Sequence, residues 1–370
     1  MSEAATLTTE ITATPTPLAI HLQTISPNLG LRRHAGMLTP QTFSSRDQEV
    51  AAALNRNAII DLGYRTRLRI TGEDRLRWLN GMVSNAIQTH PEGNGNYNFI
   101  LNAQGRIQGD AYVYRAADHL LLDTDRSQIA RLFAHLDHFI IMDDVELYRL
   151  DDATTGIGFI GPQAALALAA LGLNASALAL LEFAETTLRE TPVTLVQAYS
   201  VLVPRYELWF APEHAPTLWS ALTSAGAEPI GIDAVETLRV LEGRPRYGVD
   251  ITDRHLPQET SQTHALNFTK GCYLGQEIVE RIRSRATVRR NLRQFALDGE
   301  TPNAPADLRA AEDAAVIGQL SSVAELRLPE FHPTVALGFI RTETLERKSR
   351  IEYDGGTATV LDHPPAPSRL

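Results

Sequence analysis

The sequence contains a single cysteine, Cys272, among 370 residues. One thiol excludes an internal disulfide, a zinc site built from several cysteines, and an iron–sulfur cluster held by four cysteines of one chain. Any cluster on this protein would need ligands from a second chain or from a small thiol. So little cysteine fits a reducing compartment, and we expect a cytoplasmic protein.

Long apolar runs and an excess of basic residues are also missing. No stretch approaches the roughly 20 apolar residues of a membrane span, and the N-terminus carries Glu3 and Glu10 instead of the basic segment of a secretory signal. The formal net charge of −10 argues against bulk binding to nucleic acid or to an anionic membrane. We therefore expect no membrane contact and no direct nucleic-acid contact. We also expect a monomer, although composition does not determine the oligomeric state. The motifs of a phosphate-binding loop, a GxSxG nucleophile and a zinc site are absent too.

What the chain does contain is the composition of a globular protein, with 44% hydrophobic and 21% charged residues. Its length suggests two or three domains. Residues 1 to about 17 are rich in Thr, Ala and Pro without an apolar period, so we expect a flexible segment over 1–30. From about residue 58 to 242, strands alternate with helices in the pattern of an α+β protein. Two strand–glycine–helix units, at 67–82 and 156–171, weakly suggest an internal repeat.

The last third of the chain has a different pattern. Short apolar segments at 288–297, 315–320, 335–340, 350–353 and 357–361 are separated by proline and glycine turns. No strong helix interrupts them. This spacing predicts a small all-β barrel or sandwich.

The stretch Lys270-Gly-Cys-Tyr-Leu-Gly-Gln-Glu277 surrounds the single cysteine. Its glycines allow a tight turn and a close approach of the backbone to a ligand. After Gly275, the apolar residues Ile278 and Ile282 have helical spacing, which predicts a helix that begins directly behind the motif. A nearby lysine and a helix N-terminus both favour a thiolate at Cys272. The alternative is an inert cysteine buried in a tight loop.

Other polar side chains could form a binding site. Asp110 and Glu207 are carboxylates on predicted strands, where paired hydrogen bonds could hold an amidine-like ring edge such as that of a pterin; outward-facing strand positions are the alternative. Six arginines at 281, 283, 285, 289, 290 and 293 could bind an anion such as a polyglutamate chain, or form a solvated face. His135 and His138 have metal-ligand spacing, but a helix surface explains them better and we predict no metal.

The motif KGCYLGQE, with Glu280-Arg-Ile-Arg-Ser-Arg285 behind it, resembles the signature of the YgfZ branch of the folate-binding proteins related to the glycine cleavage T protein. Supporting matches are Leu101-Asn-Ala-Gln-Gly-Arg106, Thr237-Leu-Arg-Val-Leu-Glu-Gly243 and Tyr247-Gly-Val-Asp250. The resemblance covers residues from about 55 to the C-terminus. It implies three domains around a central opening that binds tetrahydrofolate: a discontinuous first domain (31–145 and 230–284), a ferredoxin-like second domain (146–229) and a C-terminal β-barrel (285–370).

The resemblance also implies roles for individual residues. Lys270 and Cys272 match the functional lysine and cysteine of the branch, and we expect them to be catalytic. Glu207 and Arg239 match folate-contacting positions of the superfamily, and we expect Asp110 and Tyr273 to contact the reduced folate as well. The function implied is support of the assembly or repair of iron–sulfur enzymes, including a tRNA-methylthiolating one. Partners would be these client enzymes or assembly proteins.

One departure from the T protein bears on activity. The T protein has two adjacent aspartates after the LN-x-x-G stretch, one of them catalytic, whereas this sequence reads Gly109-Asp110. The loss of one carboxylate weakens the case for aminomethyl transfer, which needs a placed acid to manage protons at the folate nitrogen. A folate-dependent aminomethyltransferase or methyltransferase remains an alternative. A third is a folate-dependent binding module in which Cys272 docks a partner or transiently ligates iron.

Overall fold

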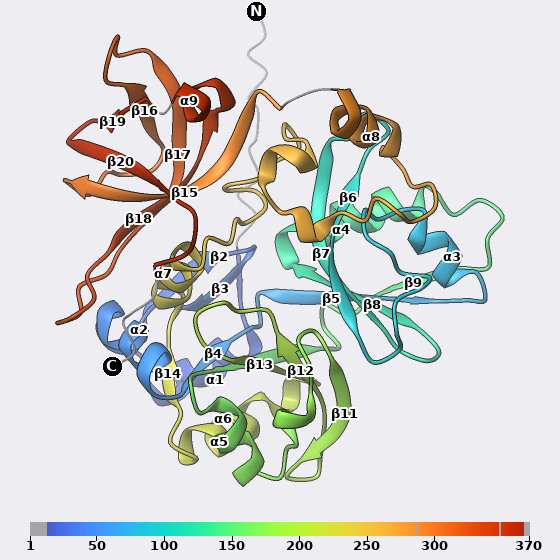
Figure 1. Ribbon diagram of the computed structural model, residues 1–370. Coiled ribbons are helices and arrows are strands. Elements are labelled where there is room, and N and C mark those ends of the chain that lie inside the picture. Colours follow the sequence, from blue (N-terminus) through green and yellow to red (C-terminus); the bar gives the residue numbers. More distant parts are fainter. Residues whose placement is uncertain (1–12, 286–287, 348, 366–370) are drawn as a thin grey trace, which may run out of the picture.

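The computed structural model describes residues 13–285, 288–347 and 349–365. Figure 1 shows three units that meet at the centre of the molecule: a five-stranded sheet with its helices, a six-stranded sheet with its helices, and a closed β-barrel. This mixed α and β architecture with a C-terminal barrel confirms the predicted fold class. Among the described helices, none is long and apolar enough to cross a membrane.

The five-stranded sheet forms from segments whose apolar and polar residues alternate. In spatial order it contains β6 (Gly95–Leu101), β7 (Ile107–Arg115), β8 (Leu120–Asp125), β5 (Arg65–Thr71) and β9 (Glu146–Arg149). One face is covered by α3 (Arg75–Asn80) and α4 (Arg126–Asp137). Their residues Trp78, Leu79, Leu132 and Leu136 pack with the inward side chains of the strands in one apolar core. The opposite face contributes residues to the centre of the molecule.

The six-stranded sheet draws on distant parts of the chain. Its spatial order is β11 (Phe183–Leu188), β12 (Thr191–Ala198), β13 (Arg205–Phe210), β10 (Thr155–Ile160), β4 (Ala58–Asp61) and β14 (Glu228–Ile230). Helices α5 (Ala164–Ala170) and α6 (Ala215–Ser224) bury their apolar sides on it. Because β4 precedes residue 146 and pairs with β10 over four residues, the second unit is not confined to the predicted range 146–229.

The N-terminal part is more ordered than the sequence predicted. Residues 1–12 lie outside the described residues, but 13–30 include β1 (Thr14–Pro15) and α1 (Pro17–Ile25). Thr16 caps α1 by accepting a hydrogen bond from the backbone N–H of Ala19, and its hydroxyl donates to the buried Asp61. α1 then buries Leu18 and Leu22 in the core of the six-stranded sheet. The predicted flexible segment 1–30 is therefore wrong for 13–30, because proline and threonine serve here as a helix start and cap.

Two further strands and one helix complete this region. The small three-stranded sheet has the order β1, β3 (Met37–Pro40), β2 (Leu31–His34). Helix α2 (Arg46–Asn55) begins at Ser45, whose side chain caps it, and packs beside α7 (Ile232–Leu241). α7 lies between the barrel and the six-stranded sheet in Figure 1 and buries Val235 and Leu238 against β4, β14 and the barrel.

The barrel closes in the order β15 (Arg290–Gly299), β18 (Thr334–Arg341), β17 (Val316–Glu325), β16 (Ala306–Ala310), β19 (Ile351–Tyr353) and β20 (Gly356–Leu361). The five predicted segments correspond to five of these strands. β16 escaped prediction because it is only five residues long and contains a single large apolar residue, Leu308, which is also the only one that is fully buried. The short helix α9 (Thr342–Arg347) follows β18.

The segment behind α7 leads to the cysteine motif. It contains the 3-10 turns η3 (Pro257–Thr260) and η4 (Thr263–Ala265), and then α8 (Gln276–Arg285). α8 begins directly after Gly275, as the spacing of Ile278 and Ile282 predicted. Gly275 has φ +83°, and an added Cβ would lie 2.6 Å from the carbonyl oxygen of Asn102, so glycine is needed at this contact.

Candidate functional site

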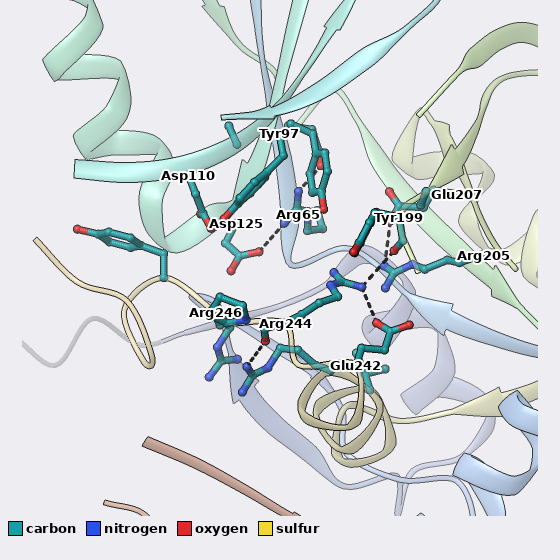
Figure 2. A pocket seen from close by; sticks show the side chains of 18 of the residues that line it. Arg65, Tyr97, Asp110, Asp125, Tyr199, Arg205, Glu207, Glu242, Arg244 and Arg246 are labelled. Carbon is teal, nitrogen blue, oxygen red and sulfur yellow. Dashed lines mark hydrogen bonds and ion pairs between the residues drawn. The ribbon is translucent and has the colours of Figure 1, made fainter. Parts of the chain in front are cut away.

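A central cavity of about 120 Å³ lies where the two sheets meet the turn that follows α7. One wall comes from β5, β7 and β8, the other from β12 and β13, and the floor from α7 and residues 242–247. Figure 2 shows that the side chains on these elements converge on one space. The polar and aromatic lining residues include Arg65, Tyr97, Asp110, Tyr199, Arg205, Glu207, Arg239, Arg244, Arg246 and His264.

Asp110 is the carboxyl group of the β7 wall. Its Oδ2 accepts a hydrogen bond from the Tyr97 hydroxyl at 2.6 Å, and its Oδ1 accepts one from Nε2 of Gln128 at 2.8 Å. Burial raises the pKa of Asp110, although these two hydrogen bonds act in the opposite direction. Asp110 lines the cavity, and each of its oxygens accepts only one hydrogen bond from the protein. The remaining lone pairs of the carboxyl group can therefore accept hydrogen bonds from a ligand.

A buried ion cluster lines the cavity between the two sheets. Arg65 pairs with Asp125 at 2.9 Å and also contacts Asp123, while Arg205 pairs with Glu207 at 2.9 Å. Burial opposes ionisation of Glu207, but the guanidinium groups of Arg205, Arg65 and Arg67 outweigh it and lower its pKa. Nε1 of Trp209 donates a further hydrogen bond to Glu207 at 3.1 Å. Glu207 is therefore a fixed carboxylate whose partners are already within the protein.

Arg239 borders the cavity, but its five N–H groups are all used within the protein. Nε and Nη2 donate to Glu236, Nη1 donates to Asp250 at 2.7 Å and to the carbonyl of Arg244 at 2.6 Å, and Nη2 also reaches Ser322 at 2.9 Å. Asp250 in turn accepts from Ser321 and Ser322 of the barrel at 2.5 and 2.7 Å. This arrangement joins α7 to β17. Arg239 therefore has no unused N–H group with which to make the expected contact to folate.

Two other arginines do offer unused donors. Arg244 donates from Nη1 to Glu242 at 3.0 Å and to the carbonyl of Tyr199 at 3.2 Å. Arg246 donates from Nη1 to Nδ1 of His34 at 2.5 Å. Within the described ranges, Nε and Nη2 of both guanidinium groups have no hydrogen-bond partner. They give this end of the cavity the chemistry to bind an anionic or carbonyl group.

His34 lines the cavity as a neutral hydrogen-bond acceptor. Because Arg246 donates to its Nδ1, that nitrogen carries no proton. Burial lowers the pKa of His34 to about 4, opposed by Glu236 and reinforced by Arg246. The same arginine, together with Arg239, overcomes the burial of Glu236 and lowers the pKa of that carboxyl to about 2.

Acid should therefore destabilise the protein through His34. As pH falls from 6.5 towards 4, the unfolded chain binds a proton at this histidine and the folded chain does not, so stability is lost in this window. In His34→Gln, which keeps an acceptor for Arg246, we expect the loss between pH 7 and 4.5 to be smaller by about 2.5 kcal/mol. Urea unfolding at both pH values measures this. The exposed His332→Gln serves as control, and an equal pH response in all three proteins would contradict the role of His34.

Aromatic rings form a stack across the cavity. The ring of His264 lies between Tyr97, at a centroid distance of 5.4 Å, and Tyr199, at 5.7 Å. Tyr112 continues the series at 5.1 Å from Tyr97. Burial lowers the pKa of His264, with a contribution from Arg244, so its ring is neutral at pH 7. A flat ligand ring can join such a stack.

The cysteine motif lies outside this cavity. Cys272 is exposed, and the lining given by the described residues includes neither Lys270, Cys272 nor Tyr273. Tyr273 is buried in an apolar cluster that also contains Tyr97. Lys270 donates from Nζ to the carbonyls of Asn80, Val83 and Asn85 at 2.6, 2.6 and 2.7 Å. Burial lowers the pKa of Lys270 to about 7, but three carbonyl acceptors favour the ammonium, which alone has three N–H donors.

The predicted site residues thus fall into two groups. Asp110, Glu207 and Arg239 meet at the cavity, whereas Lys270, Cys272 and Tyr273 belong to a neighbouring surface and its core. Sequence reasoning missed His34, Tyr97, Tyr199, Arg244 and His264. The one local signal was the sequence Arg244-Pro-Arg246, which places two arginines directly after α7 and Gly243.

The other sequence candidates lie elsewhere. Arg290 pairs with Glu259 at 3.0 Å, and Arg283 lies over the ring of Phe268 at 4.4 Å. His135 hydrogen bonds to the carbonyl of Leu101 at 3.1 Å. In the part of the chain that the structure describes, no group of three or more His, Cys, Asp or Glu side chains is arranged to hold a metal ion.

The elements that build the cavity are those of a known family. Residues 30–270 match the family described as the GCVT N-terminal domain, which is more than half of the chain. The chain belongs to the GCVT family. The GCVT match includes both walls of the cavity, and it ends at Lys270, two residues before the cysteine.

Curated relatives in this family are named aminomethyltransferases. That of Anoxybacillus flavithermus is 28% identical over 263 residues, which cover 69% of this chain and 72% of the relative. That of Thermus thermophilus is 27% identical over 245 residues, covering 66% and 70%. The Rubrobacter xylanophilus enzyme aligns over 340 residues at 24% identity, covering 91% and 87%.

The fold extends this GCVT likeness to the whole chain. The crystal structure of glycine cleavage system aminomethyltransferase T from Bartonella henselae has a TM-score of 0.83 and 19% identity, covering 94% of this chain and 96% of its own. At this identity the likeness concerns the fold alone. It includes the C-terminal barrel, which lies beyond the family match.

Proposed function

We propose that this chain binds tetrahydrofolate or another reduced folate in the central cavity and uses it for one-carbon transfer of the aminomethyltransferase type. The observation that carries the proposal is Asp110, a carboxyl with raised pKa that faces the cavity within a family whose curated members are named aminomethyltransferases. The sequence alone favoured a role in iron–sulfur enzyme assembly. The comparisons support the transferase alternative better.

The residues of the cavity suit a folate. Asp110 offers carboxylate oxygens to a polar ring edge, the rings of Tyr97 and Tyr199 offer faces for stacking, and Arg244 and Arg246 offer unused N–H groups to a carboxylate tail. A bound folate would supply the nitrogen that carries the one-carbon unit. Burial raises the pKa of Asp110, so this carboxyl holds a proton more readily than an ordinary aspartate, the direction that general acid–base chemistry at a folate nitrogen needs.

Calorimetric titration with tetrahydrofolate, followed by a turnover assay, tests the proposal. We expect saturable binding with one site per chain, and then transfer from an aminomethylated lipoyl carrier protein to tetrahydrofolate. Replacing Cys272 by alanine should change neither result, because its thiol lies outside the cavity lining. Binding without product at high enzyme concentration would refute the transferase and keep the folate site. No binding of any reduced folate would refute both.

A second candidate function follows from the exposed thiol. Cys272 stands on a loop that Lys270 ties to the carbonyls of 80–85, where it is open to a partner. We infer as the alternative a folate-binding accessory protein for iron–sulfur enzymes, in which Cys272 contacts client or assembly proteins. In that case Cys272→Ala would fold and bind folate normally but fail to restore iron–sulfur enzyme activity in a strain that lacks the protein. Full rescue by Cys272→Ala would exclude this role.

A further inference from the structure

The cavity is smaller than the ligand proposed for it. Its volume is about 120 Å³, whereas pockets for drug-sized ligands measure roughly 300–1,000 Å³. A folate that places its ring inside the cavity would therefore press against the groups that line it. His264 is the group best placed to move, because its ring stands between Tyr97 and Tyr199 and its backbone belongs to the three-residue turn η4, not to a sheet. A ligand ring that stacks on either tyrosine would displace it.

His264 is joined to the cavity wall and to the cysteine motif by one residue, Asn85. Nδ2 of Asn85 donates to the carbonyl of His264 at 2.9 Å and to that of Tyr97 at 3.1 Å. The carbonyl of Asn85 accepts from Nζ of Lys270 at 2.7 Å. Its neighbour Ser84 donates to the carbonyl of Ala265 at 2.6 Å. A shift of η4 would therefore move residues 80–85 through these hydrogen bonds, and residues 80–85 would in turn move Lys270.

Cys272 is bracketed by two attachments to the same segment. On one side Lys270 donates its three N–H groups to carbonyls of 80–85, and on the other the backbone N–H of Leu274 donates to the carbonyl of Gly81 at 2.9 Å. Asn267, between η4 and Lys270, also donates its N–H to the carbonyl of Ser84 at 3.1 Å. The loop that carries the thiol therefore cannot change position independently of 80–85.

We propose that ligand binding in the cavity changes the reactivity of Cys272, and that Asn85 and Lys270 are the positioning residues that transmit the change. The inference rests on the proposed folate site. The ligand displaces His264, the Asn85 hydrogen bonds pass the displacement to 80–85, and Lys270 passes it to the cysteine loop. This coupling would connect the predicted site residues at the cavity with those of the cysteine motif, which lie outside the cavity.

The single cysteine makes the test specific, since every thiol alkylation on this chain occurs at Cys272. The rate of iodoacetamide labelling is measured by mass spectrometry with and without saturating folinic acid, a reduced folate that needs no added thiol, and binding is measured in parallel by calorimetry. In the wild type we expect the ligand to change the rate by at least about fivefold, the lower range for coupled sites. If the cavity and the cysteine loop are coupled at equilibrium, alkylated protein should also bind folinic acid with an altered affinity.

Two variants separate transmission from simple shielding. Asn85→Asp removes both amide donors while keeping the shape and the backbone carbonyl, and Lys270→Met removes the ammonium; the exposed Asn303→Asp is the control. We expect both variants to bind folinic acid within a few-fold of the wild type and to lose the ligand-dependent change in labelling. Thermal melts confirm that they are folded.

Three outcomes would overturn the inference. If folinic acid binds the wild type but leaves the labelling rate unchanged, the coupling is wrong and the folate site stands. If both variants keep the full wild-type response, the ligand acts on Cys272 without Asn85 and Lys270. If neither folinic acid nor tetrahydrofolate binds, the folate assignment itself fails and the coupling with it.

Discussion

Replacing Asp110 by alanine is expected to weaken tetrahydrofolate binding by about 100-fold. The carboxyl is fixed by Tyr97 and Gln128 at 2.6 and 2.8 Å, so its remaining lone pairs are already oriented towards the cavity. Losing two hydrogen bonds to a charged acceptor costs about 3 kcal/mol, which corresponds to about two powers of ten in Kd. Calorimetric titration of wild type and variant measures the ratio.

The fold should survive this change. Burial raises the pKa of Asp110 and so makes its ionised form costly in the folded state, which means that removing it relieves a penalty at neutral pH. Asp118→Ala, at an exposed turn between β7 and β8, is the matched control and should bind folate as the wild type does. A variant that is folded and retains wild-type affinity would show that the ligand does not contact β7, and the cavity assignment would have to be abandoned.

Asp250→Ala is expected to cost about 3 kcal/mol of unfolding free energy. Asp250 is buried and accepts hydrogen bonds from Arg239, from the backbone of Arg246 and from Ser321 and Ser322 of the barrel. Its removal leaves the guanidinium of Arg239 short of a counter-charge, and breaking a buried pair from one side typically costs about 3–5 kcal/mol. The lower end applies because Glu236 still pairs with Arg239 at 3.1 Å.

Urea unfolding measures the free energy of unfolding, and limited proteolysis shows which part of the molecule is destabilised. The barrel should become cleavable first, since two of the lost hydrogen bonds join its Ser321 and Ser322 to Asp250, which also binds Arg239 of α7. Asp354→Ala, in the exposed turn between β19 and β20, should change the stability by no more than about 0.5 kcal/mol. Equal stability of the two variants would mean that the Asp250 network contributes nothing to barrel docking.

Much of the local structure could be predicted from the sequence. Alternation of apolar residues located β5, a short apolar segment between turns located the barrel strand β18, and helical spacing behind Gly275 located α8. These predictions succeed because side-chain periodicity reflects which face of an element is buried. Short or polar segments such as β16 escaped, and the N-terminal helix α1 was mistaken for flexible chain because its proline and threonine resemble linker composition.

The candidate site was likewise predicted only in part from the sequence. The sequence by itself determined the family motifs, one cysteine behind a lysine, and strand carboxylates at Asp110 and Glu207. Only the tertiary structure decided the partners of these residues. Arg239 donates to groups as far along the chain as Ser322, and Lys270 donates to backbone carbonyls of 80–85. Cys272 lies outside the cavity. The physical reason is that a side chain's hydrogen-bond partners come from elements brought together by packing, and no local pattern records them.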